Sequence, residues 1–330
     1  MKIKSSIRGY ELHFVGTKKL RIELQDCNFF IVDKKVFGLY KNLFNNIDKS
    51  KILLIDAVES NKDYIACKDY IEFLVNSGLK RGQKLAAIGG GIIQDIAGFV
   101  SSIIYRGVDW IYYPTTLLAQ CDSCIGGKTS INFLNFKNLV GNFNPPKKII
   151  VNTDFLNTLT DHEIQSGLGE IIKVAMIDKD QRIKSNLIVT AIKESKVNDF
   201  LIEKALEIKK EIIEIDEFDK NIRNVMNYGH TFGHAIESMT EYQVPHGIAV
   251  GIGIAIANLL SSKMGNSLQQ EFTKIDLAFL KYNKKHVNRF FTVYNVNEYV
   301  NILSKDKKNT DNECINCILP FSLGKIKKVS

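Results

Sequence analysis

The first half of the chain alternates short apolar runs rich in β-branched residues with segments whose apolar residues recur at helical spacing. Five apolar runs predict strands, at residues 28–33, 51–57, 84–91, 109–114 and 147–152. Between them, the segments 37–46 and 67–78 have helical spacing. Strands that alternate with helices are typical of a parallel sheet with helices on its faces. We therefore predict an N-terminal, Rossmann-like α/β domain.

The pattern changes near residue 155. Thr160 and Glu163 form the signature of a capping box, which opens a helix. The segment 193–216 continues with helical periodicity, and the chain shows neither an internal repeat nor a low-complexity linker. We predict an α/β domain over residues 1–160 and a mostly α-helical domain over residues 161–330, with the active site in the cleft between them.

The length, amino-acid composition and charge of the chain limit the classes of protein to which it can belong. With 330 residues, 45% hydrophobic and 24% charged, the chain is typical of a soluble globular protein, and it is longer than one core usually serves. The net charge is +8, but the lysines are scattered, whereas a nucleic-acid binder gathers them into a stripe. The longest apolar run, residues 248–260, is too short to span a bilayer. We expect a soluble, cytoplasmic protein that binds an anionic small molecule, with neither nucleic acid nor membrane as a partner.

The spacing of the cysteines raises the possibility of a zinc site. Two of the six cysteines form the pair Cys121/Cys124 and two form Cys314/Cys317, each with the spacing of a zinc knuckle. The pairs lie far apart in the sequence and lack glycine turns, so we interpret them as reduced thiols.

A glycine-rich segment, GGGIIQD at 89–95, follows a predicted strand and opens a predicted helix. Glycines there let backbone N–H groups approach a pyrophosphate at the helix N-terminus, although a tight turn without a ligand fits nearly as well. The segment does not match G-x-G-x-x-G, so an ordinary Rossmann dehydrogenase is not indicated. Asp33, Glu59 and Lys62 follow earlier strands, either as contacts for a ribose or adenine or as solvated loop residues.

Residues 113–132 and 136–146 combine two threonines, Asp122, Lys128 in a Gly-Gly-Lys-Thr turn, Lys137 and Asn138. Lysine and asparagine beside glycine-rich backbone suit an anionic, polyhydroxylated substrate. The turn lacks the upstream glycine of a P-loop, which argues against an ATPase.

Three of the six histidines lie between positions 230 and 246. His230 and His234 share one face of a predicted helix, His246 lies in the following loop, and Glu170 is upstream. Together they suit a zinc site with an open coordination position. Singly, each histidine is more typical of a hydrogen-bonded core or surface residue; as a set beside glycines, they favour a metal site.

These motifs resemble one family, the 3-dehydroquinate synthases, which are sugar phosphate cyclases. The resemblance runs from about residue 30 to 325, and its blocks lie at 89–99, 105–107, 114–132, 137–143, 167–173, 227–237 and 245–247. It implies the dehydroquinate synthase-like fold, NAD and Zn²⁺ (or Co²⁺) as cofactors, and a homodimer. The implied reaction, a step of the shikimate pathway to aromatic amino acids, converts 3-deoxy-D-arabino-heptulosonate 7-phosphate to 3-dehydroquinate with loss of phosphate.

The resemblance also assigns roles to matching positions. It implies Glu170, His230 and His246 as metal ligands and leaves His234 as an acid/base or positioning group. The implied cofactor contacts are Asp33, Glu59, Lys62, Gly89, Gly90, Gly91, Asp95, Thr115, Thr116, Lys137, Phe155 and Thr158. The implied substrate and catalytic groups are Arg106, Asp122, Lys128, Asn138, Lys173, Lys209, Asp219, Arg223, Asn227, His234 and Lys308, with Lys307 as an alternative to Lys308. Of these, Arg106 resembles the arginine that reaches the neighbouring subunit's phosphate.

The implied chemistry explains the residue types. A metal that holds two adjacent hydroxyls lowers their pKa, so that NAD can accept a hydride. Phosphate then leaves by elimination, the hydride returns, and an intramolecular aldol reaction closes the carbocycle. Cations that hold phosphate and carboxylate contribute positioning and charge stabilisation.

Three positions depart from the family pattern. Gln94 stands where glycine is usual, Asp219 where glutamate serves as a proton acceptor, and Ile248 where glutamate follows His-Gly. These departures leave open a related cyclase for a different sugar phosphate, or a non-catalytic binding protein. A metal-dependent polyol dehydrogenase of the same broad fold is a further alternative, which the cation cluster disfavours.

Overall fold

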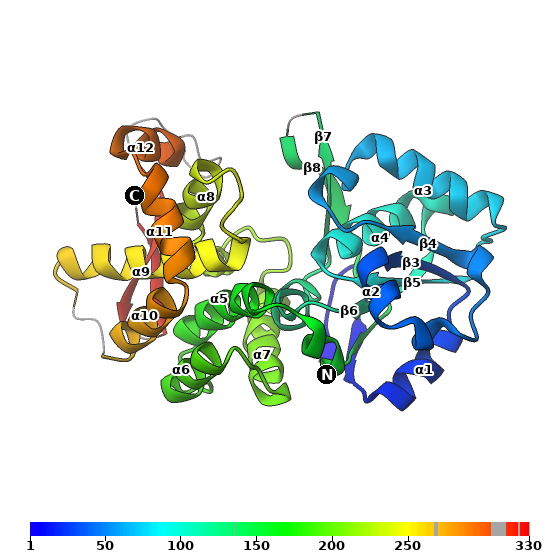
Figure 1. The fold of residues 1–330 in the computed structure, drawn as a ribbon, viewed down its shortest axis with the longest axis horizontal. Helices are drawn as coiled ribbons and strands as arrows, with labels where there is room; N and C mark the ends of the chain where they lie inside the picture. Colours follow the sequence, from blue (N-terminus) through cyan, green and yellow to red (C-terminus); the bar gives the residue numbers. More distant parts are fainter. Residues whose placement is uncertain (135, 267–269, 305–314, 323, 330) are drawn as a thin grey trace. The chain divides into compact units, whose positions relative to one another are not determined.

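The computed structural model describes residues 1–329 except 135, 267–269, 305–314 and 323 (Figure 1). The chain divides into two compact units, Met1–Thr158 and Leu159–Ser330. The first is an α/β unit and the second is mostly helical, so the predicted fold class is confirmed.

Unit 1 is built on a seven-stranded sheet with the order β1-β2-β9-β6-β5-β3-β4. All neighbours are parallel except β1 and β2. The strands are β1 (Lys2–Ile3), β2 (Tyr10–Phe14), β3 (Phe29–Asp33), β4 (Ile52–Ile55), β5 (Lys84–Gly89), β6 (Asp109–Pro114) and β9 (Lys148–Val151). The helices are α1 (Thr17–Gln25), α2 (Lys34–Leu39), α3 (Tyr64–Asn76) and α4 (Gly91–Ile103).

The central strands are apolar along their whole length because both faces of the sheet are covered. Phe30, Val32, Ala86 and Ile88 belong to one buried cluster that also takes in Leu20 of α1. On β3 and β5, Ile31 pairs in register with Ala87, and both are fully buried. Helix α4 is buried over most of its length and contacts β5, β6 and β3. This packing fixes the ends of the parallel strands.

The strand order creates a switch point. After β3 the chain continues to β4 on one side, and after β5 it continues to β6 on the other side. In open α/β sheets, ligands bind outside the carboxyl ends of the strands where the order reverses. In this sheet that place lies after Asp33 and Gly89, the last residues of β3 and β5.

The five predicted strands are confirmed as β3, β4, β5, β6 and β9. The structure adds β1 and β2 at one side of the sheet and an antiparallel hairpin, β7 (Lys128–Phe133) and β8 (Phe136–Phe143), beside α4 (Figure 1). The segment 37–46 contains the end of α2 and a 3-10 helix, Lys41–Phe44, where one helical segment was predicted.

Unit 2 is a helical assembly around α9. Its helices are α5 (Asp161–Ile177), α6 (Ser185–Glu194), α7 (Asp199–Ile215), α8 (His230–Met239), α9 (His246–Lys263), α10 (Gln270–Tyr282), α11 (Lys284–Val293) and α12 (Val296–Ser304). A hairpin, β10 (Cys317–Ser322) and β11 (Lys325–Val329), packs on α9 (Figure 1). The capping box of Thr160 and Glu163 at the start of α5 is confirmed.

Helix α9 is long and apolar enough to cross a membrane by length and composition, but 61% of it is buried inside the protein. It contacts α5, α8 and α10, as the core helix of a globular unit does. Its apolar sequence therefore follows from its central place.

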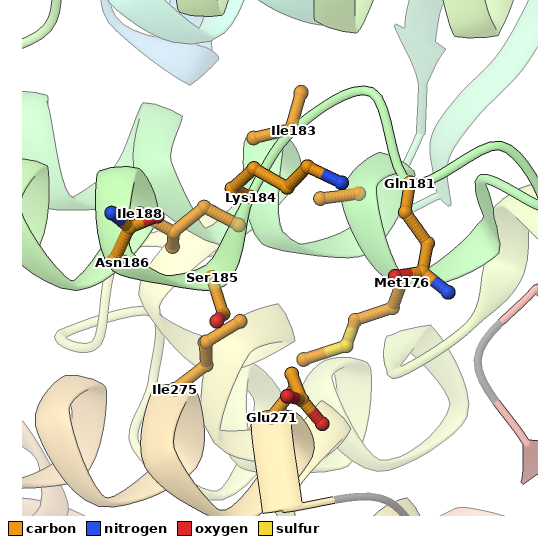
Figure 2. A pocket seen from close by; sticks show the side chains of 10 residues that line it. Met176, Gln181, Ile183, Lys184, Ser185, Asn186, Ile188, Glu271 and Ile275 are labelled. Carbon is orange, nitrogen blue, oxygen red and sulfur yellow. The ribbon is translucent and has the colours of Figure 1, made fainter.

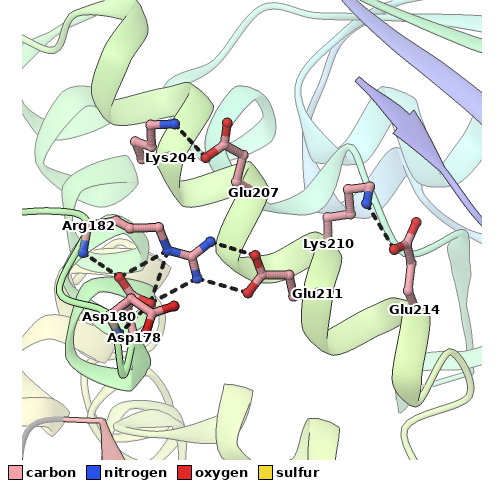
Figure 3. Close-up of polar contacts among 8 residues, drawn as sticks. All are labelled: Asp178, Asp180, Arg182, Lys204, Glu207, Lys210, Glu211 and Glu214. Carbon is pink, nitrogen blue, oxygen red and sulfur yellow. Dashed lines mark hydrogen bonds and ion pairs between the residues drawn. The ribbon is translucent and has the colours of Figure 1, made fainter.

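The loop after α5 is fixed to α7 by Arg182. Its guanidinium donates to both carboxylate oxygens of Glu211, at 2.6 and 2.9 Å, and to Asp178 at 2.9 Å (Figure 3). Asp178 is buried, so Arg182 compensates a carboxylate that water does not reach. The same figure shows the half-buried ion pairs within α7, such as Lys210 with Glu214.

Candidate metal centre and cofactor loop

The glycine-rich segment of unit 1 forms a turn between β5 and α4, with Gly90 as the N-cap of the helix. A Cβ at Gly89 would lie 2.5 Å from Ile93, and one at Gly90 would lie 2.9 Å from Thr116, so packing requires both glycines. At Gly91 only the Ser123 hydroxyl lies near, at 3.9 Å, so packing does not require glycine there. A glycine there would let a ligand approach the backbone closely, and the N–H groups of the first helical turn suit a pyrophosphate.

The other implied cofactor residues of unit 1 lie at the same edge of the sheet. Asp33 ends β3 and caps α2, while Glu59 and Lys62 follow β4. Burial raises the pKa of Asp33. Thr115 and Thr116 follow β6, and Phe155 and Thr158 follow β9. Phe155 is buried against the ring of Tyr40, whose hydroxyl lies 3.0 Å from that of Thr158.

Lys62 connects this edge to the hairpin. Its ammonium group is buried and donates to Asp95 at 3.0 Å and to Asn138 at 2.7 Å, and it lies 3.3 Å from Glu59. The hydroxyl oxygen of Ser130 lies 2.9 Å from a side-chain oxygen of each of the same two residues, Asp95 and Asn138, and its one hydrogen can bond to either. Burial raises the pKa of Asp95, and Lys62 opposes that rise. The structure thus brings three implied cofactor residues and the implied catalytic Asn138 into one hydrogen-bonded network.

Ser130 and Asn132 were missed from the sequence. Asn132 donates to Glu59 at 2.8 Å and accepts from the backbone N–H of Asn138 at 2.9 Å. Its bond to Glu59, together with Lys62, lowers the pKa of that carboxyl against the effect of burial. Both residues alternate along β7 with apolar neighbours, and that alternation was the available signal.

The departure at Gln94 is accommodated by packing. Its side chain is buried, its amide donates to the Ser123 carbonyl at 2.7 Å, and the Ser123 hydroxyl donates back at 2.7 Å. This reciprocal pair fastens α4 to the π-helical turn Ala119–Ser123, which contains Asp122. The extra bulk therefore points into the unit. Lys128 and Lys137 are exposed on the hairpin, and Arg106 is exposed after α4.

Unit 2 brings Glu170, His230 and His246 together from three helices. Glu170 lies in α5, and the two histidines are the first residues of α8 and α9. The Nε2 atoms of His230 and His246 lie 3.7 and 3.4 Å from Glu170 Oε1. All three candidate ligand atoms lie within 4.8 Å of one another. This set of two imidazoles and one carboxylate fits Zn²⁺ with an open position.

Each histidine is oriented through its other ring nitrogen. His246 Nδ1 lies 3.1 Å from the Glu237 carboxylate, and His230 Nδ1 lies 3.3 Å from the Tyr228 carbonyl. Donation from Nδ1 leaves both Nε2 atoms for a metal. Glu237 was not assigned from the sequence, although it stands three residues after His234 on the same helix face.

The electrostatics of this group favour a cation. Burial alone would lower the pKa of His246, but hydrogen bonds to Glu170 and Glu237 raise it to about 10. Burial and the nearby Lys173 hold the pKa of His230 well below its usual value. Lys173 and the histidines hold the pKa of Glu170 well below its usual range, although burial opposes this. The carboxylates of Glu170 and Glu237 both flank His246, so a positive charge is stabilised there.

Glycines beside the ligands let the helices approach. A Cβ at Gly169 would lie 1.8 Å from the Gly247 carbonyl, and one at Gly247 would lie 1.8 Å from the Ser166 carbonyl. Gly229, before His230, has φ 79°, and its Cβ would lie 2.7 Å from the Val250 carbonyl. Each ligand therefore follows or precedes a glycine at a helix contact.

The remaining implied residues of unit 2 are distributed around this group. Lys173 is buried and contacts Glu170 directly, and Lys209 and Arg223 are buried on α7 and on the 3-10 helix Ile222–Asn227, which both contact α5. Arg223 donates to the backbone carbonyl of Glu217. Asp219 lies in the loop before it with φ 59°. Lys307 and Lys308 lie outside the described residues.

His234 is exposed on α8, and its ring centroid lies 5.9 Å from that of His246. With Glu237 and His246 it forms a second group of possible ligands. The first group is the better metal site because Glu170 is buried there and Glu237 is already bound to Nδ1 of His246.

A pocket of about 240 Å³ in unit 2 lies elsewhere, between the end of α5, the start of α6 and α10 (Figure 2). It is lined by Met176, Gln181, Lys184 and Glu271, among others. No residue implied for metal, cofactor or substrate lines it, so we assign it no part in the site.

Known proteins resemble this chain over most of its length. Family models described as 3-dehydroquinate synthase N-terminal and C-terminal match residues 52–166 and 167–309. A 3-dehydroquinate synthase of Thermoanaerobacter sp. (strain X514) is 36% identical over 312 residues, which cover 92% of this chain and 86% of that protein. A 3-dehydroquinate synthase of Campylobacter hominis is 38% identical over 301 residues, covering 90% and 86%.

A solved structure shares the fold. The 2-epi-5-epi-valiolone synthase ValA of Streptomyces hygroscopicus subsp. jinggangensis 5008, with NAD⁺ and Zn²⁺ bound, is similar with a TM-score of 0.80. The match covers 97% of this chain and 92% of that one, at 22% identity. At this identity, the likeness concerns the fold alone.

Proposed function

The chain belongs to the 3-dehydroquinate synthase family, and from this premise we propose that it converts 3-deoxy-D-arabino-heptulosonate 7-phosphate to 3-dehydroquinate with release of phosphate. The observation that carries the proposal is the convergence of Glu170, His230 and His246 in the helical unit. Unit 1 binds NAD at the carboxyl edge of its sheet, and unit 2 holds Zn²⁺ or Co²⁺ and substrate groups.

The chain's own residues bind, orient and transfer protons. Gly89 to Gly91 present backbone N–H groups to the NAD pyrophosphate, and Asp33 and Glu59 lie at the strand ends where a ribose would be bound. NAD supplies a reversible hydride acceptor for one substrate carbon. Lys62 and Ser130 hold the Asn138 side chain by its oxygen, which leaves the amide N–H groups of Asn138 free to donate to substrate.

In unit 2, Glu170 and the two histidines hold the metal, which lowers the pKa of substrate hydroxyls when bound. Lys173, Lys209 and Arg223 are buried cations of this unit, and they suit a substrate that carries a phosphate and a carboxylate. Lys128 is an exposed cation of unit 1, to which the resemblance also assigns substrate binding. His234, exposed beside the ligands, serves as the acid/base group, and Asp219 serves as the shorter proton acceptor.

The departures from the family pattern bear on the substrate. Ile248 is fully buried in α9, within the apolar core of unit 2. Gln94 is bound to Ser123 within unit 1. Only Asp219 changes a group placed for chemistry, and it keeps the carboxylate. These observations favour the heptulosonate phosphate over another sugar phosphate.

The cellular setting is also part of the proposal. We expect a cytoplasmic homodimer in which Arg106, exposed after α4, binds the phosphate held by the neighbouring subunit.

The test is an assay of purified protein with NAD, Zn²⁺ and the heptulosonate phosphate. We expect phosphate release and an equal amount of 3-dehydroquinate, with no net NADH, and loss of both products in His246→Ala. Net NADH from a simple polyol would instead indicate a polyol dehydrogenase. Absence of phosphate release by a protein that binds both cofactors would reject this substrate.

A further inference from the structure

A chain of polar side chains runs from the apolar interior of unit 2, where Tyr228 and Asn258 are buried, to the half-buried Asp276. The Tyr228 hydroxyl donates to the side-chain oxygen of Asn258 in α9. The Asn258 amide in turn donates to the Asp276 carboxylate in α10 at 2.8 Å. Tyr228 and Asn258 are almost completely buried, at 0% and 3% exposure. Burial of such groups costs stability unless each is hydrogen-bonded, and here the amide and the phenol satisfy one another.

The other end of this chain reaches the metal centre. The Tyr228 carbonyl lies 3.3 Å from Nδ1 of His230, so it fixes which ring nitrogen faces Glu170. Between them, Gly229 adopts φ 79°, and a Cβ there would lie 2.6 Å from Ile254 in α9. The segment is therefore fastened to α9 twice, by backbone packing at Gly229 and by the Tyr228 hydroxyl.

Helix α9 also begins with His246 and contains Asn258. A shift of Tyr228 against this helix would move His230 relative to His246. We infer that Tyr228, Asn258 and Asp276 form a positioning chain that holds His230 in ligand geometry. The inference rests on the metal site of the proposed function, and it assigns roles that the sequence motifs did not.

A carboxyl group at Asp276, at the end of this chain, costs free energy of folding. Burial raises its pKa to about 7, opposed by the hydrogen bond from Asn258. Among the described residues, Asn258 is its hydrogen-bond partner, and no cation contributes to its pKa. A leucine at position 276 would cost less free energy of folding. The carboxylate is explained if it orients the Asn258 amide, so that the amide oxygen faces Tyr228.

The test measures metal binding, not turnover. Metal-free protein is titrated with Zn²⁺ against a chromophoric chelator, and with Co²⁺ while its visible absorption is recorded. We expect Tyr228→Phe, which keeps the ring, to weaken Zn²⁺ binding about 10-fold and to change the Co²⁺ spectrum. Asp276→Leu should do the same, and Asp276→Asn, whose amide oxygen still accepts from Asn258, should restore wild-type behaviour.

Tyr113→Phe is the matched control, because it removes an equally buried hydroxyl in unit 1 that donates to a backbone carbonyl. It should leave both metal readouts unchanged. Wild-type Zn²⁺ affinity and an unchanged Co²⁺ spectrum in folded Tyr228→Phe would overturn the inference. Failure of the wild-type protein to bind either metal would instead refute the metal site of the proposed function, and the positioning chain with it.

Discussion

The carboxylate of Glu237 accepts from Nδ1 of His246 at 3.1 Å, and this contact allows a quantitative prediction. A hydrogen bond to a charged group contributes about 1.5–3 kcal/mol, and 1.4 kcal/mol corresponds to a tenfold change in affinity. Because 38% of the His246 side chain is exposed, solvent screening places the effect near the lower limit. Glu237→Ala removes the acceptor and should weaken Zn²⁺ binding by about 10-fold, and Glu237→Gln, which keeps a neutral acceptor, should weaken it less.

Competition with a chromophoric chelator measures both dissociation constants on metal-free protein. Glu241→Gln is the control, because it removes an exposed charge from the same stretch of chain without touching His246. Its Zn²⁺ affinity should equal that of the wild-type protein. If Glu237→Ala bound Zn²⁺ as tightly as the wild-type protein does, orientation of His246 through Nδ1 would be refuted.

Three further predictions concern stability. Arg182→Ala leaves the buried carboxylate of Asp178 without its cation and should lower the free energy of unfolding by about 2 kcal/mol in urea, somewhat less than for a fully buried pair. Burial lowers the pKa of His286, whose Nε2 lies 3.0 Å from His162, so the folded state binds fewer protons than the unfolded chain. Stability should therefore fall as the pH drops below about 6.5, and less steeply in His286→Gln. Gly169→Ala forces a Cβ to within 1.8 Å of a carbonyl of α9 and should lower the melting temperature and weaken Zn²⁺ binding.

For each of these three predictions, one experimental outcome would contradict the reasoning. A loss below about 0.5 kcal/mol for Arg182→Ala would show that the ion pair is dispensable. Equal pH slopes in His286→Gln and the wild-type protein would remove His286 as the titrating group. Gly38→Ala, where a Cβ would meet nothing within 4 Å, controls for Gly169→Ala. Equal Zn²⁺ affinity in Gly169→Ala and that control would contradict the packing argument.

Much of unit 1 follows from local pattern. Strands β3 to β6 and β9 are apolar on both faces, and such runs identify buried parallel strands without knowledge of their partners. Strand β2 has a mixed sequence, Tyr10–Phe14, and becomes a strand only through pairing with β9. From the sequence, the residues of the hairpin β7–β8 were interpreted as substrate-binding loops and not as strands. Their polar side chains, which form a network with Lys62, interrupt the apolar pattern of a strand. Pairing between strands that lie far apart in the sequence cannot be predicted from the spacing of apolar residues within each strand.

In unit 2, capping chemistry predicted the start of α5, but the segment 193–216 was taken as one helical run. It contains a break, where α6 ends at Glu194, the following Ser195 adopts a left-handed conformation, and α7 begins after Asn198. The family resemblance selected Glu170, His230 and His246 as ligands, whereas the group as a whole, His234 included, was predicted from residue types and the glycines beside them. Glu237, Tyr228 and Asn258 were not, because hydrogen-bond orientation depends on how helices far apart in sequence pack.

The most direct test of the account is the position of the metal itself. Crystals of the protein with Zn²⁺, measured at the zinc absorption edge, should show an anomalous peak about 2.0–2.2 Å from Nε2 of His230, Nε2 of His246 and a carboxylate oxygen of Glu170. An anomalous peak coordinated instead by His234 and Glu237, or no peak within unit 2, would contradict the account.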